Sequence, residues 1–275
     1  APIFRHWLQF IAEADGAVCI SRAVAQELAA WLGEHGPPRL RPYRISWFHL
    51  GADVKQSAPT RGMPEGAPAV LAALRARPSF LMVATIEPRK GHAQTLAAFE
   101  QLWARGVEAN LVFVGKAGWR VEALLERLRS HPEAGRRLYW LEGISDEYLD
   151  AVYAASRALI AASLGEGFGL PLIEAARHRV PIIARDIPVF REVAGEHAFY
   201  FADDHAPETI ARAVEDWLAL DRQGRAPQSA GMPYLTWAES AEQLFRRIAE
   251  IVERVELPPE ADRASTQPTL WRLLD

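Results

Sequence analysis

The sequence contains very little cysteine and no long apolar run. Cys19 is the one cysteine among 275 residues, which excludes an intramolecular disulfide and a cysteine-rich metal site. No apolar stretch approaches the roughly 18 residues that cross a bilayer, and the first residues lack the basic segment and apolar core of a secretory signal. These absences favour a globular protein of the reducing cytoplasm.

Basic charge and metal-binding patterns are also sparse. The 31 basic residues are outnumbered by 35 acidic ones, so the chain has no basic field that would wrap a nucleic acid, although a local patch can hold a small anion. The eight histidines form neither His-x-His nor His-Glu-x-x-His, so we expect no metal site. We also expect no cofactor. The Gly-x-Ser-x-Gly elbow of many hydrolases is missing too.

What the sequence does contain is a regular alternation of short apolar runs and amphipathic stretches, beginning near Pro78. An alternation of this kind is typical of βαβ units around a parallel sheet. It predicts an α/β fold, a Rossmann-like doubly wound parallel sheet of about six strands. The six predicted strands are SFLMVAT, ANLVFVG, LYWLEG, ALIAAS, VPIIAR and AFYFAD.

The domain organisation is predicted from composition. A stretch rich in proline, glycine and small residues follows Gly51, where we place a boundary. Residues 51–255 form the predicted Rossmann-like domain, which includes a long amphipathic helix that begins near Thr236. Residues 256–275 are predicted to form a polar, flexible tail.

Residues 1–50 are expected to form a separate segment. Its first part predicts a strand, a helix capped by Ser21 and a helix end near Gly33. The stretch RLRPYRISWFHL then predicts a strand in which Ile45, Trp47 and His49 alternate inward. Its basic and aromatic residues leave open an alternative, contact with an anionic membrane surface.

The stretch SLGEGFGLPLIEA combines three glycines with a predicted helix start. Gly165, Gly167 and Gly169 let the backbone approach a ligand closely, and Pro171 suits the first turn of a helix beginning near Leu170. The helix dipole favours negative charge at that end. Because the loop follows a predicted strand, we expect an anion-binding site at the carboxyl edge of the sheet.

Two glutamates, Glu166 and Glu174, lie on either side of this predicted anion site. Carboxylates accept hydrogen bonds from hydroxyl pairs, which sugars present in abundance. A ligand with a hydroxylated ring on each side of a diphosphate fits this arrangement, and nucleotide sugars have that shape. The alternative is a tight strand–helix connection whose glutamates are merely solvated.

A second anion-seeking feature follows the first strand of the predicted sheet. In TIEPRKGHAQTL, Arg89 offers a bidentate fork for phosphate oxygens and Lys90 a point charge. The pair could also be an ordinary solvated basic dipeptide. Two such features on one sheet edge favour a binding site.

Together, GEGFGLPLIEA and IEPRKGH resemble the Glu-x7-Glu signature and the donor-phosphate segment of the retaining glycosyltransferases of family 4. Weaker support comes from three further stretches that occur in the order expected for the family: LVFVGKAG, LEGISDEYLDAVYAAS and RDIPVFREVAG. The resemblance implies a GT-B fold, with this chain as its C-terminal, donor-binding half. Residues 1–50 are then a remnant of the N-terminal, acceptor-side domain, and the rest of that domain, or a partner chain, is missing.

The resemblance also implies roles for individual residues. Glu166, Arg89 and Lys90 act on the sugar and the diphosphate without a metal, and Glu174 binds the ribose. Many members carry a second arginine where this chain has Thr85, so the phosphate contact rests on Arg89 and Lys90. The remaining donor contacts are implied for the backbone of Gly167, Phe168, Gly169 and Leu170 and, beside the base, for Ile144 and Asp146.

The implied function is transfer of a hexose, of mannose type, from a GDP- or UDP-sugar to a glycan or lipid-linked acceptor. The resemblance places it in polysaccharide or lipopolysaccharide synthesis, in the cytoplasm or peripherally at the inner membrane face. We expect the chain alone to bind donor but to transfer slowly or not at all. The alternative is a noncatalytic nucleotide-sugar-binding subunit whose partner binds the acceptor.

The two interpretations of RLRPYRISWFHL differ in a flotation experiment. Because a strand interior is not available to lipid, we expect the chain to stay at the bottom of a density gradient with anionic liposomes at low salt. Flotation at low salt that disappears at high salt would instead support the membrane alternative.

Overall fold

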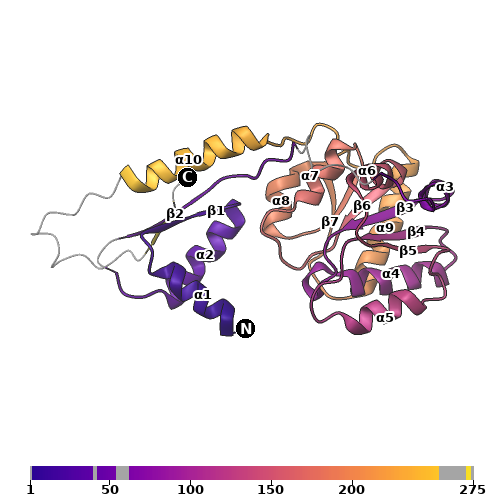
Figure 1. Cartoon of the computed structure of the whole chain (residues 1–275), viewed down its shortest axis with the longest axis horizontal. Helices are drawn as coiled ribbons and strands as arrows, with labels where there is room; N and C mark the ends of the chain where they lie inside the picture. The colour runs from indigo at the N-terminus through magenta and orange to yellow at the C-terminus, as the bar shows by residue number, and fades with distance from the viewer. Residues whose placement is uncertain (1, 40–41, 54–61, 254–270, 274–275) are drawn as a thin grey trace, which may run out of the picture. The chain divides into compact units, whose positions relative to one another are not determined.

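The computed structural model describes residues 2–39, 42–53, 62–253 and 271–273 (Figure 1). The chain divides into two compact units. The first comprises Ala1–Asp53 with Tyr234–Asp275, and the second comprises Val54–Pro233. The first unit is therefore built from both ends of the chain, and the second from the continuous segment between them.

The second unit is built on a six-stranded sheet with the order β5-β4-β3-β6-β7-β8, in which every pairing is parallel. All six predicted strands are confirmed. The order places β3 and β6 side by side, where the connections change direction, and ligands of open α/β sheets bind at such points. The strands are β3 (Ser79–Val83), β4 (Asn110–Val114), β5 (Leu138–Leu141), β6 (Ala158–Ala161), β7 (Ile182–Arg185) and β8 (Ala198–Phe201).

Helices cover both faces of this sheet (Figure 1). Helix α4 packs against α9, and α3 packs against α6. Helix α3 was not predicted from the sequence, because it begins within the proline- and glycine-rich stretch and its N-cap, Gly66, makes no side-chain hydrogen bond. The helices are α3 (Ala67–Arg75), α4 (His92–Ala104), α5 (Glu122–Ser130), α6 (Asp146–Ala155), α7 (Leu170–Arg177), α8 (Pro188–Ala194) and α9 (Pro207–Arg222).

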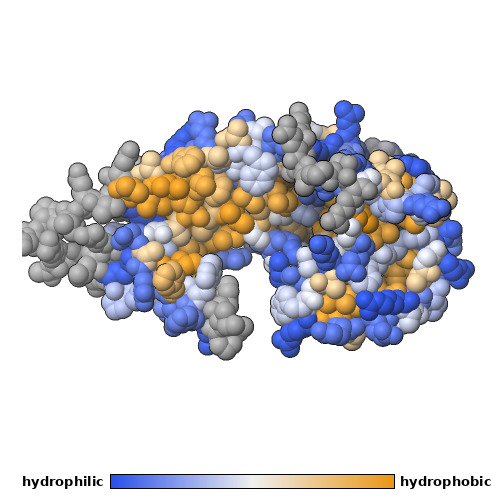
Figure 2. Space-filling view, viewed as in Figure 1, coloured by the Kyte–Doolittle hydropathy of each residue, from blue (hydrophilic) through white to orange (hydrophobic). Residues whose placement is uncertain are grey.

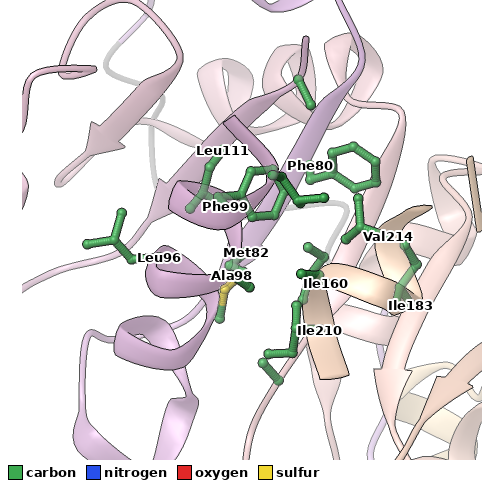
Figure 3. Packing of buried hydrophobic residues seen from close by; sticks show 14 of the residues in the cluster. Phe80, Met82, Leu96, Ala98, Phe99, Leu111, Ile160, Ile183, Ile210 and Val214 are labelled. Atoms are coloured by element: carbon green, nitrogen blue, oxygen red, sulfur yellow. The ribbon is translucent and has the colours of Figure 1, made fainter. Parts of the chain in front are cut away.

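The main core of this unit lies between the sheet and helices α4, α5 and α9. Phe80 of β3 is at its centre, with its ring edge-on to Phe99 of α4 at 5.6 Å and to Trp217 of α9 at 5.9 Å. Figure 3 shows apolar side chains from strands and helices converging on this region. Burial of these aromatic side chains fixes the sheet and, with it, the loops at its carboxyl edge.

The first unit contains a three-stranded parallel sheet with the order β1-β2-β9. Ser21 caps α2 as predicted, since its Oγ accepts the Val24 N–H at 3.2 Å. The helix runs to His35 rather than ending near Gly33, because Gly36 is the residue that caps it. The elements are α1 (Pro2–Ala12), which the sequence analysis did not predict, β1 (Gly16–Cys19), α2 (Arg22–His35), β2 (Tyr43–Trp47), α10 (Trp237–Glu253) and β9 (Trp271–Leu273).

The C-terminal part of the chain differs from the sequence-based division. Helix α10 packs against β1 and β2, so it groups with the first unit and not with the Rossmann-like domain predicted to extend to residue 255. Strand β9, within the predicted tail 256–275, pairs with β2. Residues 256–270 lie outside the described part of the chain. Long-range pairing, which composition does not reveal, accounts for the difference.

The predicted strand in RLRPYRISWFHL is confirmed as β2, although its alternation is not. Ile45 is fully buried, but Trp47 is only half-buried and His49 lies beyond the end of the strand. Arg44 of this strand donates to the Ile251 carbonyl of α10 at 2.8 Å. None of the described helices is both long enough and apolar enough to span a bilayer.

One histidine of the second unit is enclosed in apolar surroundings. His92, the first residue of α4, is 1% exposed and lies edge-on to the Phe113 ring at 4.9 Å. Neither ring nitrogen has a hydrogen-bond partner in the part of the chain that the structure describes. Burial, and secondarily the charge of Lys90, lowers the pKa of His92 to about 4.

A lowered histidine pKa makes stability depend on pH. Above the unfolded-state pKa of about 6.5 the group is neutral in both states, and as the pH falls towards 4 only the unfolded state gains the proton. We therefore expect His92 to reduce the free energy of unfolding by about 3 kcal/mol between pH 7 and pH 4. Urea titrations over this pH range, followed by tryptophan fluorescence, measure the change.

The isosteric variant His92→Phe should lack this part of the pH dependence. His205→Phe is the matched control, because His205 is exposed. If His92→Phe and the control show the same pH dependence as the wild type, His92 is protonated equally in both states and the expectation is wrong.

Candidate functional site

Two loops meet where β3 and β6 end, and each carries a predicted site motif. The loop after β3 contains a 3-10 turn over Pro88–Lys90, and the Arg89 carbonyl accepts the Leu164 N–H of the other loop at 2.8 Å. Gly91 adopts a φ of 79°, and a Cβ there would lie 2.4 Å from the Ala162 carbonyl oxygen. The close approach therefore requires glycine on both steric and conformational grounds.

This approach brings Glu166 to the two predicted cations. The ammonium of Lys90 pairs with Glu166 Oε1, and the Arg89 guanidinium lies 3.6 Å from Oε2. Ser163 donates its hydroxyl to Oε1 at 2.9 Å. The side chains of Lys90 and Glu166 are both only 13% exposed, so solvent screens their interaction weakly.

Arg89 is more exposed and is held by a second carboxylate. Its Nε donates to Glu87 at 3.0 Å, and its Nη1 donates to the Gly165 carbonyl at 3.2 Å. The side chain is 48% exposed, so these ion pairs add little to stability. Their effect is positional, because they hold the half-exposed guanidinium beside the glycine loop.

Helix α7 begins beside these charges. Gly169 precedes it with a φ of 94°, and a Cβ there would lie 3.0 Å from the Phe190 ring. The helix starts at Leu170, as predicted, with Pro171 in its first turn. The N–H groups and dipole of this end favour an anion near the cations.

A small cavity of about 20 Å³ lies between the cluster and the ends of the strands, with Lys90, Glu166, Ser163 and Gly169 among its lining residues. Such a volume accommodates about one water molecule. The space beneath the charges is therefore too small for a larger ligand, which would have to bind above the cluster.

A buried arginine that the sequence analysis did not single out supports the loop after β6 from below. Arg185 of β7 is fully buried, and its Nε donates to the Ala162 carbonyl at 3.1 Å. Its other nitrogens bind Asp203 at 3.3 Å and the side chain of Gln94 on α4. Burial lowers the pKa of Arg185, and the neighbouring Asp203 opposes the shift. This network fixes the carbonyl that Gly91 approaches.

The structure does not bring every predicted site residue to the cation pair. Glu174, in α7, accepts the Tyr153 hydroxyl at 2.8 Å and, among the described residues, pairs with neither Arg89 nor Lys90. Ile144 and Asp146 lie after β5, the edge strand, which β4 and β3 separate from β6. Glu174, Ile144 and Asp146 therefore lie at the carboxyl edge of the sheet but outside the cluster of Arg89, Lys90 and Glu166.

The sequence analysis missed two hydrogen-bond donors of the site. Ser163 belongs to the quoted glycine loop, and its position three residues before Glu166 was an available signal. Tyr153 occurs in a predicted helix, where a buried hydroxyl needs an acceptor, but its partner could not be named without the tertiary structure. No group of three or more potential metal-binding side chains occurs among the described residues.

The close approach at Gly91 can be tested by substitution. Gly91→Ala introduces both a left-handed alanine and a contact with a backbone oxygen, whereas Gly106→Ala at a φ of 80° meets nothing within 4 Å. We expect Gly106→Ala to cost about 1 kcal/mol of unfolding free energy and Gly91→Ala about 1–3 kcal/mol more. Urea unfolding of both variants measures the difference, and equal losses would show that the loops separate at no cost.

Comparison with known proteins assigns the chain to a family. The family model for glycosyl transferases of group 1 matches residues 69–231. The serotype-specific mannosyltransferase WbdA of Escherichia coli is 54% identical over 250 residues, which are 89% of this chain and 30% of WbdA. The O-antigen chain mannosyltransferase B of Escherichia coli is 32% identical over 138 residues, which are 49% of this chain and 35% of that protein.

Solved glycosyltransferase structures share the fold at low sequence identity. Sucrose-phosphate synthase from Thermosynechococcus elongatus aligns with a TM-score of 0.66 at 21% identity, covering 90% of this chain and 61% of that chain. Anabaena HepE, solved with UDP and glucose, aligns with a TM-score of 0.61 at 15% identity, covering 88% and 64%. This chain spans about 30% of the length of WbdA. It shares the α/β fold of these glycosyltransferase structures and belongs to the group 1 glycosyl transferases.

Proposed function

We propose that this chain binds the nucleotide-diphosphate sugar of a retaining glycosyltransferase that transfers a mannosyl group to a glycan or lipid-linked acceptor. The observation that carries the proposal is the meeting of Arg89, Lys90 and Glu166 beside the N-terminus of α7. Two cations, a helix dipole and a carboxylate match a diphosphate joined to a polyol.

The cations address the diphosphate. Lys90 and Arg89 lie in the loop that follows the carboxyl end of β3. A phosphate above the cluster accepts hydrogen bonds from both side chains. It also accepts hydrogen bonds from the backbone N–H groups of Gly167, Phe168, Gly169 and Leu170. Negative charge develops on the leaving diphosphate as the glycosidic bond breaks. Cations already fixed by Glu166 and Glu87 stabilise that charge without reorganisation, so the step needs no metal.

The two glutamates bind the hydroxylated rings on either side of the diphosphate. Glu166 is held by Lys90 and Ser163 and accepts hydroxyls of the transferred sugar. Glu174 accepts the ribose hydroxyls. The base extends towards the carboxyl end of β5, where Ile144 is half-buried and Asp146 begins α6.

The mannosyl group and the acceptor class are suggested by the relatives. WbdA and the O-antigen chain mannosyltransferase are named for mannosyl transfer, and HepE was solved with UDP and glucose. A GDP- or UDP-linked hexose used in lipopolysaccharide synthesis at the cytoplasmic face of the membrane fits these names.

A further domain or partner chain binds the acceptor in this proposal. The first unit has an exposed apolar stripe on α10 that would suit such a partner. Phe245, Ile248 and Val252, spaced three and four residues apart, are 70%, 41% and 64% exposed. Figure 2 shows apolar surface along this helix.

Charge removal tests the diphosphate site. We expect Lys90→Ala and Arg89→Ala each to weaken the binding of GDP or UDP by about 10- to 100-fold, because each removes a charge-assisted hydrogen bond. Isothermal titration calorimetry gives the dissociation constants. Arg105→Ala is the matched control, since this exposed arginine of the α4 C-terminus pairs with Glu215 and should leave binding unchanged. Equal affinities of all three variants would refute the site.

Because Glu166 and Glu174 have different proposed roles, we expect their removal to weaken the binding of different ligands. Glu166→Ala should weaken GDP-mannose or UDP-glucose but not the bare diphosphates, because Glu166 faces the sugar in this proposal. Glu174→Ala should weaken every nucleotide with an intact ribose. A thermal-shift panel separates these patterns, and equal loss of bare-diphosphate binding by both variants would contradict the division of roles.

A further inference from the structure

Glu174 differs from Glu166 in having no cation partner among the described residues. It is half-buried on α7, and its one side-chain hydrogen bond within the described part of the chain is the one that Oε2 accepts from the Tyr153 hydroxyl at 2.8 Å. A carboxylate with one donor on one oxygen keeps the lone pairs of its other oxygen for a ligand. Oε1 of Glu174 is therefore the available acceptor.

Tyr153 is itself held rigidly. The side chain is 1% exposed, and its ring stacks on His178 with centroids 4.8 Å apart and an interplanar angle of 4°. His178 Nε2 in turn lies 3.1 Å from Asp150 on the turn of α6 that precedes Tyr153. Asp150 and Tyr153 of α6 thus face Glu174 and His178 of the α7 end through three contacts. This arrangement gives the hydroxyl one fixed position.

The tyrosine hydroxyl is also a permanent donor. Burial raises the pKa of Tyr153 well above its usual value, and the charge of Glu174 raises it further. The phenol therefore keeps its proton, and Glu174 Oε2 remains the acceptor of this hydrogen bond. The hydrogen bond from Tyr153 therefore restricts rotation of the Glu174 carboxylate. Unlike a cation partner, it leaves the negative charge of the carboxylate in place.

We propose that Tyr153 is a positioning residue that orients the Glu174 carboxylate and thereby sets the preference of the site for nucleotides with ribose hydroxyls. This inference rests on the proposed donor-binding function. Tyr153 does not contact the ligand in this scheme; it acts through Glu174. Its removal should therefore affect nucleotides with ribose hydroxyls and spare those without them.

The experiment compares GDP and UDP with their 2′,3′-dideoxy forms by calorimetry, using the 275-residue chain. We expect Tyr153→Phe to weaken the ribonucleotides about tenfold and the dideoxynucleotides less than about twofold, since a hydrogen bond to a charged group is lost. In the Glu174→Ala background, adding Tyr153→Phe should have no further effect. Tyr139→Phe is the matched control, because it deletes a hydroxyl that donates to the Arg136 carbonyl in the same unit.

The possible results separate the two proposals. Equal loss of ribo- and dideoxynucleotides, or a tenfold loss that persists in the Glu174→Ala background, would show a structural role for Tyr153 and overturn the inference alone. Failure of the wild type to bind either diphosphate would refute the proposed function. Wild-type binding without preference for the ribonucleotide would refute the Glu174 role and, with it, this inference.

A second variant guards against an unstable Tyr153→Phe protein. His178→Ala removes the stacking ring but leaves the hydroxyl, so we expect a smaller loss, about two- to threefold, again confined to the ribonucleotides. A loss that is equal for the dideoxy forms would count against the inference in the same way.

Discussion

The candidate site depends on how closely the loops after β3 and β6 approach one another. Gly91 lies against the Ala162 carbonyl, at a distance that no side chain permits. Arg185 holds the same carbonyl from the interior of the unit. If the loops after β3 and β6 moved apart here, Lys90 would separate from Glu166. The two charged side chains would then no longer form one site.

The charges of the cluster compensate one another before any ligand arrives. Glu166 accepts hydrogen bonds or ion pairs from Lys90, Arg89 and Ser163, so two cations are kept in place at a weakly solvated edge. Two cations this close repel one another, and the carboxylate that pairs with both offsets that repulsion. The carboxylate therefore stabilises the cluster itself, in addition to the contact with the sugar that is proposed for it.

The sequence predicted local and periodic features well. Apolar runs with helical stretches between them identified all six strands of the main sheet, and the glycine loop with Pro171 located the start of α7. The sequence also predicted that Arg89, Lys90 and Glu166 lie at one edge of the sheet, because the carboxyl ends of successive parallel strands lie on the same side of it. The contact of Lys90 with Glu166, however, spans 76 positions and depends on β3 and β6 being neighbours.

The features that escaped prediction are those decided by tertiary packing. The hydroxyl of Tyr153 finds Glu174 only once α6 and α7 lie together, and Arg185 reads as an ordinary strand-end cation until its burial is known. Helix α10 has the amphipathic pattern of any surface helix, which does not reveal the sheet against which it packs.

The grouping of α10 with β1 and β2 has a consequence for biosynthesis. Residues 54–233 form a continuous unit that can collapse as soon as it leaves the ribosome. Strands β1 and β2, by contrast, must wait for a helix that begins about 190 residues after the end of β2. At about 5–20 residues per second, that delay amounts to roughly 10–40 seconds. During this interval the apolar surfaces of the emerging first segment lack their covering helix, so chaperones have their clearest opportunity to bind there.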